Sequence, residues 1–237
     1  MVEYKKHELR THILDQSPEM YVGSISPEAI SSFIVDNENK IVCKTINYSP
    51  ALYKIFDELI VNAADHVVRM NLSNLTDKQI VKNIKVTVDR ENNSISVYND
   101  GDGISIEIHE ETKLYNPSLI FGELLTSGNY DKSKDRLTGG LNGLGAKLAI
   151  IFSNEATVET VDHRNKLMFK QTFKENLLKK DKPKIKETTK SPYTKITCSL
   201  DLARFGFTSI TDDIFALFKK RTFEIAALTP PNVNVYF

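Results

Sequence analysis

Residues 138–147 have the sequence Thr-Gly-Gly-Leu-Asn-Gly-Leu-Gly-Ala-Lys, with four glycines among the seven residues from Gly139 to Gly145. A segment that is apolar except for Lys147, Ala146 to Phe152, follows these glycines directly and is predicted to form a buried helix. Glycines that open a helix leave a row of backbone N–H groups free to bind an anion. The stretch therefore predicts a phosphate-binding loop.

This loop does not match the common phosphate-binding motifs. The gap from Gly140 to Gly145 fits a Walker A loop. However, Ala146 then precedes Lys147, and Leu148 replaces the Ser or Thr that the motif requires. The dinucleotide fingerprint G-x-G-x-x-G also fails, because Leu148 stands where its last glycine should be. The sequence thus predicts a phosphate loop on a fold that is neither a P-loop nor a Rossmann domain.

The longest predicted helix carries a polar stripe opposite its apolar one. It begins at Ser49-Pro50, an N-cap residue followed by proline at the first helical position. Glu58, Asn62 and Asp65 are spaced so that they share one face of this helix. Such stripes are common on solvated helices. The neighbouring Ala63-Ala64, however, lets a ligand or another backbone approach closely, which makes the stripe a candidate site.

A second candidate segment follows a predicted β-hairpin. Two alternating segments, residues 84–89 and 94–99, are joined by the turn-forming residues Glu91-Asn92-Asn93. The hairpin leads into Asn99-Asp-Gly-Asp-Gly103, where two glycines alternate with acidic residues and allow a close backbone approach. Taken alone, this segment is equally compatible with an ordinary tight turn.

The remaining pattern completes a fold of mixed type. Residues 1–25 are polar and predict an N-terminal arm outside the core, and residues 26–237 predict one domain. A lysine-rich connector over residues 178–190 predicts a solvated, mobile loop. Further helices are expected over residues 117–126 and 210–228, and strands over residues 156–161, 167–173, 193–200 and 232–237. The fold class is therefore α/β (α+β), a two-layer sandwich with a mixed sheet.

Composition excludes several classes of protein. The 237 residues carry 31 Lys+Arg and 31 Asp+Glu, so the net charge is zero and argues against a stand-alone DNA-binding module. An enzyme whose DNA-binding surface lies elsewhere remains possible. Cys43 and Cys198 have no zinc-type spacing and predict two buried thiols. The longest apolar run, Leu148 to Phe152, is far too short to span a membrane, so an intracellular protein is expected.

Together the three motifs resemble those of the GHKL ATPases and, more narrowly, the N-terminal ATPase region of the eukaryotic-type (type IIA) DNA topoisomerases II. These motifs are Glu58-Leu-Ile-Val-Asn-Ala-Ala-Asp65, Asn99-Asp-Gly-Asp-Gly103 and the glycine-rich residues 138–147. The segments that carry the narrower resemblance are His12–Leu14, Tyr21–Ser24, Leu52–Asp57, Ile120–Ser127, Thr157–Thr160, Ser191–Lys195 and Asp201–Gly206. The resemblance implies a GHKL (Bergerat) fold, in which helices cover a mixed sheet.

The resemblance also implies roles for the polar residues. Glu58 would be the general base that takes a proton from the water attacking the γ-phosphate of ATP. Asn62 would coordinate Mg²⁺, and Asp65 would belong to the same nucleotide-binding face. Asn99 would recognise adenine, because its amide can accept a hydrogen bond from the exocyclic amine.

Contacts to the ribose and phosphates would come from Ser127 and Asn129, between the second and third motifs, and from residues 140–147 of the third motif itself. Lys147 would add a point charge to the phosphate loop. Tyr4 would reach from the arm into the nucleotide site of a dimer partner. The residues matched to nucleotide contacts are Ser127, Gly128, Asn129, Gly140, Leu141, Asn142, Gly143, Leu144, Gly145 and Ala146.

Five positions depart from the pattern of the family. Gly128 replaces a serine, Leu141 an arginine and Leu144 a tyrosine. Asp102 replaces a basic residue, and His66 replaces an asparagine. The backbone contacts to phosphate do not depend on these side chains, so ATP binding is expected to persist.

The function implied is that of an ATP-driven gate. ATP binding would close a homodimer around a DNA segment for strand passage, with DNA bound by the full-length enzyme and Mg²⁺ as cofactor. A lysine from a following transducer domain would assist hydrolysis, so this part alone is expected to bind ATP but hydrolyse it poorly. The localisation would be the nucleus, or a viral factory or the cytoplasm for a large DNA virus. The alternatives are a GHKL chaperone, a mismatch-repair-type clamp, or a non-catalytic ATP-gated dimerisation module.

Overall fold

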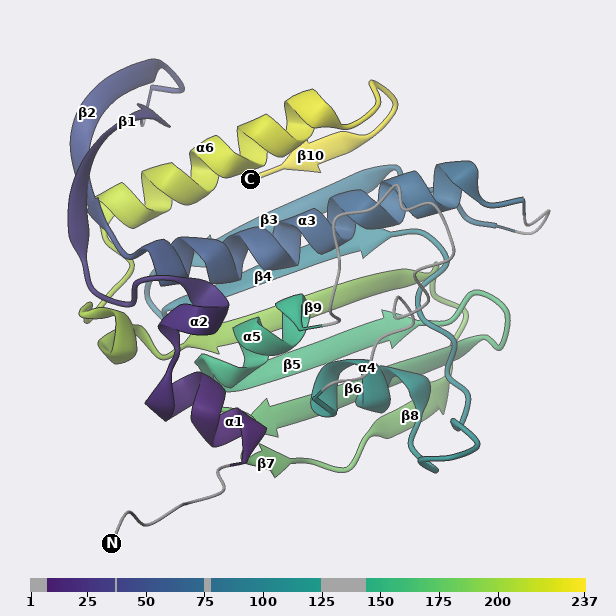
Figure 1. Ribbon diagram of the computed structural model, residues 1–237. Helices are drawn as coiled ribbons and strands as arrows, with labels where there is room; N and C mark the ends of the chain where they lie inside the picture. Colours follow the sequence, from purple (N-terminus) through teal and green to yellow (C-terminus); the bar gives the residue numbers. More distant parts are fainter. Residues whose placement is uncertain (1–7, 37, 75–77, 125–143) are drawn as a thin grey trace, which may run out of the picture.

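The computed structural model describes residues 8–36, 38–74, 78–124 and 144–237 (Figure 1). Its helical elements are α1 (Leu9–Thr11), the π-helical turn η1 (His12–Gln16), α2 (Glu19–Val22), α3 (Pro50–Leu72), α4 (Asn116–Gly122), α5 (Gly145–Ile151), the 3₁₀ turn η2 (Leu202–Phe205) and α6 (Asp212–Leu228). Its strands are β1 (Glu28–Val35), β2 (Ile41–Tyr48), β3 (Asn83–Asp89), β4 (Ser94–Asp100), β5 (Ser153–Val161), β6 (Leu167–Lys174), β7 (Lys179–Lys180), β8 (Lys184–Glu187), β9 (Tyr193–Leu200) and β10 (Asn234–Tyr236).

Most of the strands form one mixed sheet in the order β10-β3-β4-β9-β5-β6-β7, with β8 also paired to β6. β10 runs parallel to β3, and the other pairs are antiparallel. Figure 1 shows α3, α4 and α5 on one face of this sheet, and their apolar sides share a single core with it. The predicted two-layer α/β sandwich is confirmed.

The long helix α3 crosses this face, and the sequence explains where it begins. The Ser49 side-chain oxygen accepts a hydrogen bond from the Leu52 backbone N–H at 3.3 Å, as expected of an N-cap residue before a proline. The Phe56 ring stacks on Phe218 of α6, with ring centroids 4.1 Å apart. The buried residues of α3 are Ala51, Leu52, Ile55, Phe56, Leu59, Ile60, Ala63 and Val67. Burial of each large apolar side chain in this set stabilises the fold by roughly 1.5–3 kcal/mol.

The predicted hairpin is confirmed as β3 and β4, and its register places one polar residue on the helical face. Successive side chains of a strand point to opposite faces of the sheet. Val97 and Asn99 are 4% and 8% exposed and face the helices, whereas Tyr98 between them faces the other side. The hairpin therefore carries Asn99 beneath α3.

The expectation that residues 1–25 lie outside the core is wrong for the part of this segment that the structure describes. Ile13, Leu14 and Val22 are at most 3% exposed and belong to the main core. The surrounding sequence is polar, so its few apolar residues did not form a recognisable pattern. They nevertheless anchor α1, η1 and α2 against the domain.

Two paired segments were missed or misassigned. β1 and β2 form a separate antiparallel hairpin before α3, which the sequence did not predict. The lysine-rich connector was expected to be a loop, but residues 179–180 and 184–187 pair with β6. α4 ends at Gly122, so the helix predicted over residues 117–126 was too long. Ile34 and Ile46 of this hairpin form a small separate core with Ala216 and Leu217 of α6.

The two cysteines differ in burial, which corrects the prediction of two buried thiols. Cys198 is fully buried in the core, and burial raises the pKa of its thiol to about 12. Cys43 lies on β2 and is exposed. Across the described parts of the chain, no helix combines the length and apolar character that a membrane crossing requires.

Candidate active site

A cavity of about 640 Å³ lies between α3 and the sheet. Its volume is in the range of small-molecule binding sites, which is about 300–1,000 Å³. Residues from α2, α3, β4, α4, α5 and β9 line it. The residues expected from the sequence that line this cavity are Glu58, Asn62, Asp65, Asn99, Leu144, Gly145 and Ala146.

Glu58 lies where α3 approaches the first turn of α5. Its Oε1 atom is 2.5 Å from the Lys54 ammonium group, one helical turn earlier. A Cβ atom built on Gly145 would be 2.9 Å from Glu58 Cδ, and Oε2 lies closer still. A side chain at position 145 would therefore displace the Glu58 carboxylate, a constraint that the loop sequence alone did not reveal.

Asn62 and Asp65 continue the same face of α3. The Asn62 amide nitrogen donates a hydrogen bond to the Glu58 carbonyl oxygen at 2.5 Å, so the amide oxygen is not used in that bond. Asp65 is half-buried and interacts electrostatically with Arg69, one turn later. The predicted polar stripe thus faces a cavity rather than open solvent.

Asn99 lies on the floor of the cavity, opposite α3. It is 8% exposed and is paired in register with Thr194 on β9, which also lines the cavity. The Thr194 hydroxyl is 3.1 Å from the Thr160 hydroxyl of β5. β5 pairs with β9 on the side away from β4, and this contact supports the floor there. An amide and a hydroxyl side by side can exchange several hydrogen bonds with a polar ring system.

The turn after Asn99 is shaped by two glycines with positive φ. Gly103 has φ +73°, and a Cβ atom there would be 2.8 Å from the carbonyl carbon of Val161. Asp102 accepts hydrogen bonds from the Gln79 backbone N–H and from Arg164, the latter at 3.0 Å. The ordinary tight turn considered for this segment is therefore also a part of the cavity wall, since Gly103 lines it.

His66 packs beneath Gly101 at the edge of the cavity. A Cβ atom on Gly101, which has φ +129°, would be 2.8 Å from His66 Nε2. This Nε2 atom is buried and has no hydrogen-bond partner among the described residues. Burial and the nearby Arg69 guanidinium lower the pKa of His66 to about 4, although Asp102 and Asp100 act in the opposite direction. The imidazole is therefore neutral at pH 7.

Several predicted residues remain untested. Lys147 is 1% exposed and does not line the cavity, and burial lowers the pKa of its ammonium group to about 8. Its proposed role at the phosphates stays a prediction. The predicted residues that lie outside the described parts of the chain are Tyr4, Ser127, Gly128, Asn129, Gly140, Leu141, Asn142 and Gly143.

The cavity also contains residues to which sequence reasoning gave no role. Lys54 could have been found from its spacing of four residues before Glu58, and Arg69 from its position one turn after Asp65. Tyr21 and Met20 reach the cavity from α2, in a segment expected to lie outside the core. Thr194 had no local signal, because only strand pairing brings it beside Asn99.

Comparison with known proteins identifies the class. Residues 47–204 match the model of the histidine kinase-, DNA gyrase B-, and HSP90-like ATPase family. This region includes α3, the β3–β4 hairpin and α5, which together form most of the cavity. The chain belongs to this family of ATPases, and the GHKL fold expected from its motifs is confirmed.

Within this family, the chain is similar to the ATPase region of DNA topoisomerase 2, as its motifs indicated. It is 47% identical over 240 residues to DNA topoisomerase 2 of Acanthamoeba polyphaga mimivirus, covering 99% of this chain and 18% of the relative. It is 44% identical over 225 residues to DNA topoisomerase 2 of Penicillium chrysogenum, covering 94% of this chain and 14% of the relative. The chain therefore spans less than a fifth of the length of these relatives.

Solved structures of topoisomerase II ATPase regions also match this chain. The crystal structure of the ATPase region of Saccharomyces cerevisiae topoisomerase II matches with a TM-score of 0.91 at 40% identity, covering 98% of this chain and 60% of that one. The ATPase and transducer domains of DNA topoisomerase II from Balamuthia mandrillaris match with a TM-score of 0.89 at 39% identity, covering 98% of this chain and 59% of that one. These similarities favour a topoisomerase ATPase domain over a chaperone or a mismatch-repair-type clamp.

Proposed function

We propose that this chain binds ATP in the cavity beneath α3 and acts as the ATP gate of a type IIA DNA topoisomerase. One observation supports this most strongly: Glu58 and Asn62 of α3 and Asn99 of β4 line one cavity at the start of α5. The membership of the chain in an ATPase family supplies the substrate. The domain boundaries are part of this proposal: a nucleotide-binding domain over residues 26–237 and an arm over residues 1–25, whose Ile13, Leu14 and Val22 pack in the core of that domain.

Glu58 is the proposed general base for ATP hydrolysis. A base of this kind must lie within hydrogen-bonding reach of the attacking water. Lys54 holds one carboxylate oxygen of Glu58 and leaves Oε2 facing Gly145, where the phosphate loop enters α5. This arrangement directs a carboxylate toward the place where the loop would bring the γ-phosphate.

Asn99 and Thr194 are proposed to bind adenine from the floor of the cavity. The Asn99 amide can accept a hydrogen bond from the exocyclic amine of adenine and can donate one to a ring nitrogen. The apolar wall around them includes Val97, Ile104 and Ile196, which can pack against the faces of the base.

The residues also fit a magnesium ion. Mg²⁺ prefers oxygen ligands and is usually held by one or two protein groups together with substrate phosphates. Asn62 lines the cavity, and its amide oxygen is the proposed protein ligand, with Asp65 on the same face of α3. A bound Mg²⁺ would offset the negative charge of the phosphates.

The wider function rests on the similarity to longer proteins. Since the chain spans only 18% of the mimivirus relative, strand passage, DNA binding and closure of a homodimer are proposed for the full-length protein. Within the proposal, Tyr4 contacts the nucleotide of the partner subunit. Ser127, Asn129 and residues 140–147 contact the ribose and phosphates. The protein acts in the nucleus, or in a viral factory or the cytoplasm if it is viral.

Nucleotide binding provides the first test. Residues 1–237 should bind a non-hydrolysable ATP analogue with Mg²⁺ in isothermal titration calorimetry. Glu58→Ala should bind the analogue about as tightly as the wild type but abolish turnover in the full-length protein. Asn62→Ala should lose the dependence of binding on Mg²⁺. Loss of binding in Glu58→Ala would reject its role as general base.

DNA relaxation tests the wider function. The full-length protein should relax supercoiled DNA only when ATP is present. ATP-dependent dimerisation without relaxation would instead indicate a clamp or a dimerisation module. Relaxation that is unchanged in Glu58→Ala would show that strand passage does not use this site.

A further inference from the structure

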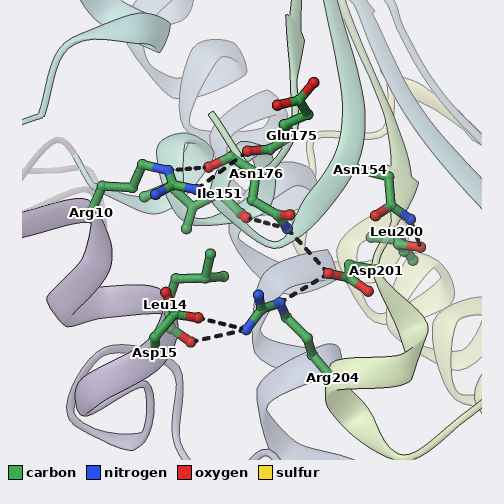
Figure 2. Close-up of polar contacts among 10 residues, drawn as sticks. All are labelled: Arg10, Leu14, Asp15, Ile151, Asn154, Glu175, Asn176, Leu200, Asp201 and Arg204. Atoms are coloured by element: carbon green, nitrogen blue, oxygen red, sulfur yellow. Dashed lines mark hydrogen bonds and ion pairs between the residues drawn. The ribbon is translucent and has the colours of Figure 1, made fainter. Parts of the chain in front are cut away.

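The N-terminal segment, defined here as residues 8–22, packs on the core through its buried apolar side chains and makes further polar contacts through two arginines (Figure 2). The Arg10 guanidinium donates hydrogen bonds to the carbonyl oxygens of Asn176 at 2.7 Å and Glu175 at 3.3 Å. These carbonyls belong to the turn after β6, where residues 175–177 all have positive φ, between +53° and +65°. Arg10 thus connects the N-terminal segment to a tightly shaped turn.

The same turn holds the end of α5. The Asn176 side-chain amide donates to the Ile151 carbonyl oxygen at 3.0 Å, and Ile151 is the last residue of α5. The first residue of this short, buried helix is Gly145, which lies against Glu58 in the cavity. Asn176 therefore lies between the N-terminal segment on one side and the helix that begins at the nucleotide site on the other.

A second arginine closes this contact network. Asp201 Oδ2 accepts from the Asn176 amide at 3.3 Å and from Arg204 Nε at 2.9 Å. Arg204 Nη1 in turn donates to the Asp15 carboxylate at 2.9 Å and to the Leu14 carbonyl oxygen at 3.3 Å. Figure 2 shows this path from η1 through Arg204 and Asp201 to Asn176.

The N-terminal segment also contributes directly to the cavity. Met20 and Tyr21 of α2 line it, and the Tyr21 hydroxyl is 3.0 Å from His12 Nδ1 within the same segment. If the segment leaves the domain, the cavity loses this wall. The nucleotide site is therefore complete only when the segment is docked.

We propose that docking of the N-terminal segment and nucleotide binding are coupled, with Arg10 and Arg204 as positioning residues for the site. This inference rests on the proposed function, because the ligand is the ATP of that proposal. The observed affinity for a ligand falls in proportion to the fraction of molecules in the binding-competent state. Burial of Ile13, Leu14 and Val22 keeps the segment on the core, while ion pairs with partly exposed members, such as Arg204 with Asp15, are individually weak, so the arginines set how the segment is positioned.

Coupling of this kind acts in both directions. If docking strengthens nucleotide binding by some factor, then nucleotide must strengthen docking by the same factor. The second effect distinguishes coupling from simple destabilisation. An arginine that only stabilised the fold would change the unfolding midpoint without making docking of this segment depend on nucleotide.

The test uses residues 1–237 and a non-hydrolysable ATP analogue with Mg²⁺. We expect the double variant Arg10→Ala, Arg204→Ala to bind the analogue roughly fivefold or more weakly, within the usual range of coupling between sites. Hydrogen exchange of amides in residues 9–22 should be faster in the double variant. In the wild type, the analogue should slow this exchange. The factor should equal the one by which docking of the segment strengthens analogue binding. Arg10→Lys and Arg204→Lys, which keep the charge, should recover part of the affinity.

Arg90 offers a matched control. It donates to the Ile210 carbonyl oxygen at 3.0 Å and pairs with Asp212 at 2.8 Å, so it makes the same kinds of contact away from the cavity. Arg90→Ala should leave the affinity unchanged. Unchanged affinity or unchanged exchange in the double variant would overturn the inference while the proposed function stands. Failure of the wild type to bind the analogue would refute the proposed function and the inference together.

Discussion

Replacement of Gly145 by alanine tests how closely the proposed catalytic base fits the phosphate loop. A new Cβ atom would be 2.9 Å from Glu58 Cδ, whereas ordinary contacts of this type begin at about 3.4 Å. The Cδ atom must therefore move by at least about 0.5 Å, and the carboxylate oxygen, which lies closer, by about 1 Å or more. This movement also disturbs the 2.5 Å contact with Lys54.

The expected effect is on turnover rather than on folding. Alanine is favoured over glycine in helices by up to about 1 kcal/mol, which offsets the loss of one partly exposed ion pair. A misplacement of about 1 Å in a reacting group can lower the rate about a hundredfold, equivalent to about 2.7 kcal/mol in activation free energy. Gly145→Ala should therefore keep most of its stability and analogue affinity, and lower kcat by roughly a hundredfold.

Single-turnover hydrolysis of radiolabelled ATP, measured beside analogue binding, checks this expectation. The control is a double-mutant cycle with Glu58→Ala, because in that background alanine at position 145 no longer meets a carboxylate. Gly145→Ala should then cause no further loss of the residual rate. Wild-type turnover in Gly145→Ala would refute the reasoning. An equal loss of rate with and without the Glu58 carboxylate would show that the glycine acts through another contact.

Three further predictions concern burial and backbone conformation. The His66 pKa of about 4 lies below the unfolded value of about 6.5, so protonation favours unfolding. Stability measured in urea should fall as pH decreases from 6.5 to 4, and this dependence should weaken in His66→Gln. Iodoacetamide should modify Cys43 rapidly in the native protein, while Cys198 should react only after denaturation, and mass spectrometry can follow both thiols. Gly103→Ala should destabilise the fold by at least about 2 kcal/mol in thermal unfolding, because its Cβ atom would meet the Val161 backbone at positive φ; a native-like melting curve would contradict this.

Elements with strong local signals were predictable from the sequence. Ser49-Pro50 marked the start of α3 because capping depends on neighbours along the chain, and the Ser49 hydrogen bond to Leu52 confirms it. The β3–β4 hairpin followed from alternation, which directly reflects the two faces of a strand. The three nucleotide motifs could be recognised for the same reason, since each is a continuous segment.

Features that depend on tertiary contacts were not predictable. In β1 and β2, Phe33 and Ile41 are 62% and 74% exposed, so the alternation that identifies a half-buried strand is missing. The segment around Ile13 and Leu14 is polar, and its anchoring depends on distant partners such as Arg204. β7 and β8 are held by backbone hydrogen bonds to β6, which side-chain composition does not report.

The active site showed the same limit. The sequence predicted through family resemblance that Glu58 and Gly145 belong to one site, but not that a side chain at position 145 would displace the carboxylate. Thr194 joined Asn99 only through the register of β9. Contacts between residues far apart in the chain require the fold, and these contacts set the chemistry of the cavity.

Four cavity residues, Glu58, Asn62, Asp65 and Arg69, lie on the single helix α3. In an α-helix each residue adds a turn of about 100° and a rise of about 1.5 Å. Insertion or deletion of one residue before Glu58 would turn all four side chains out of the cavity together, whereas a change in a surface loop would leave them in place. During evolution the length of this helix is therefore expected to resist insertions and deletions, even where individual side chains on its outer surface are free to change.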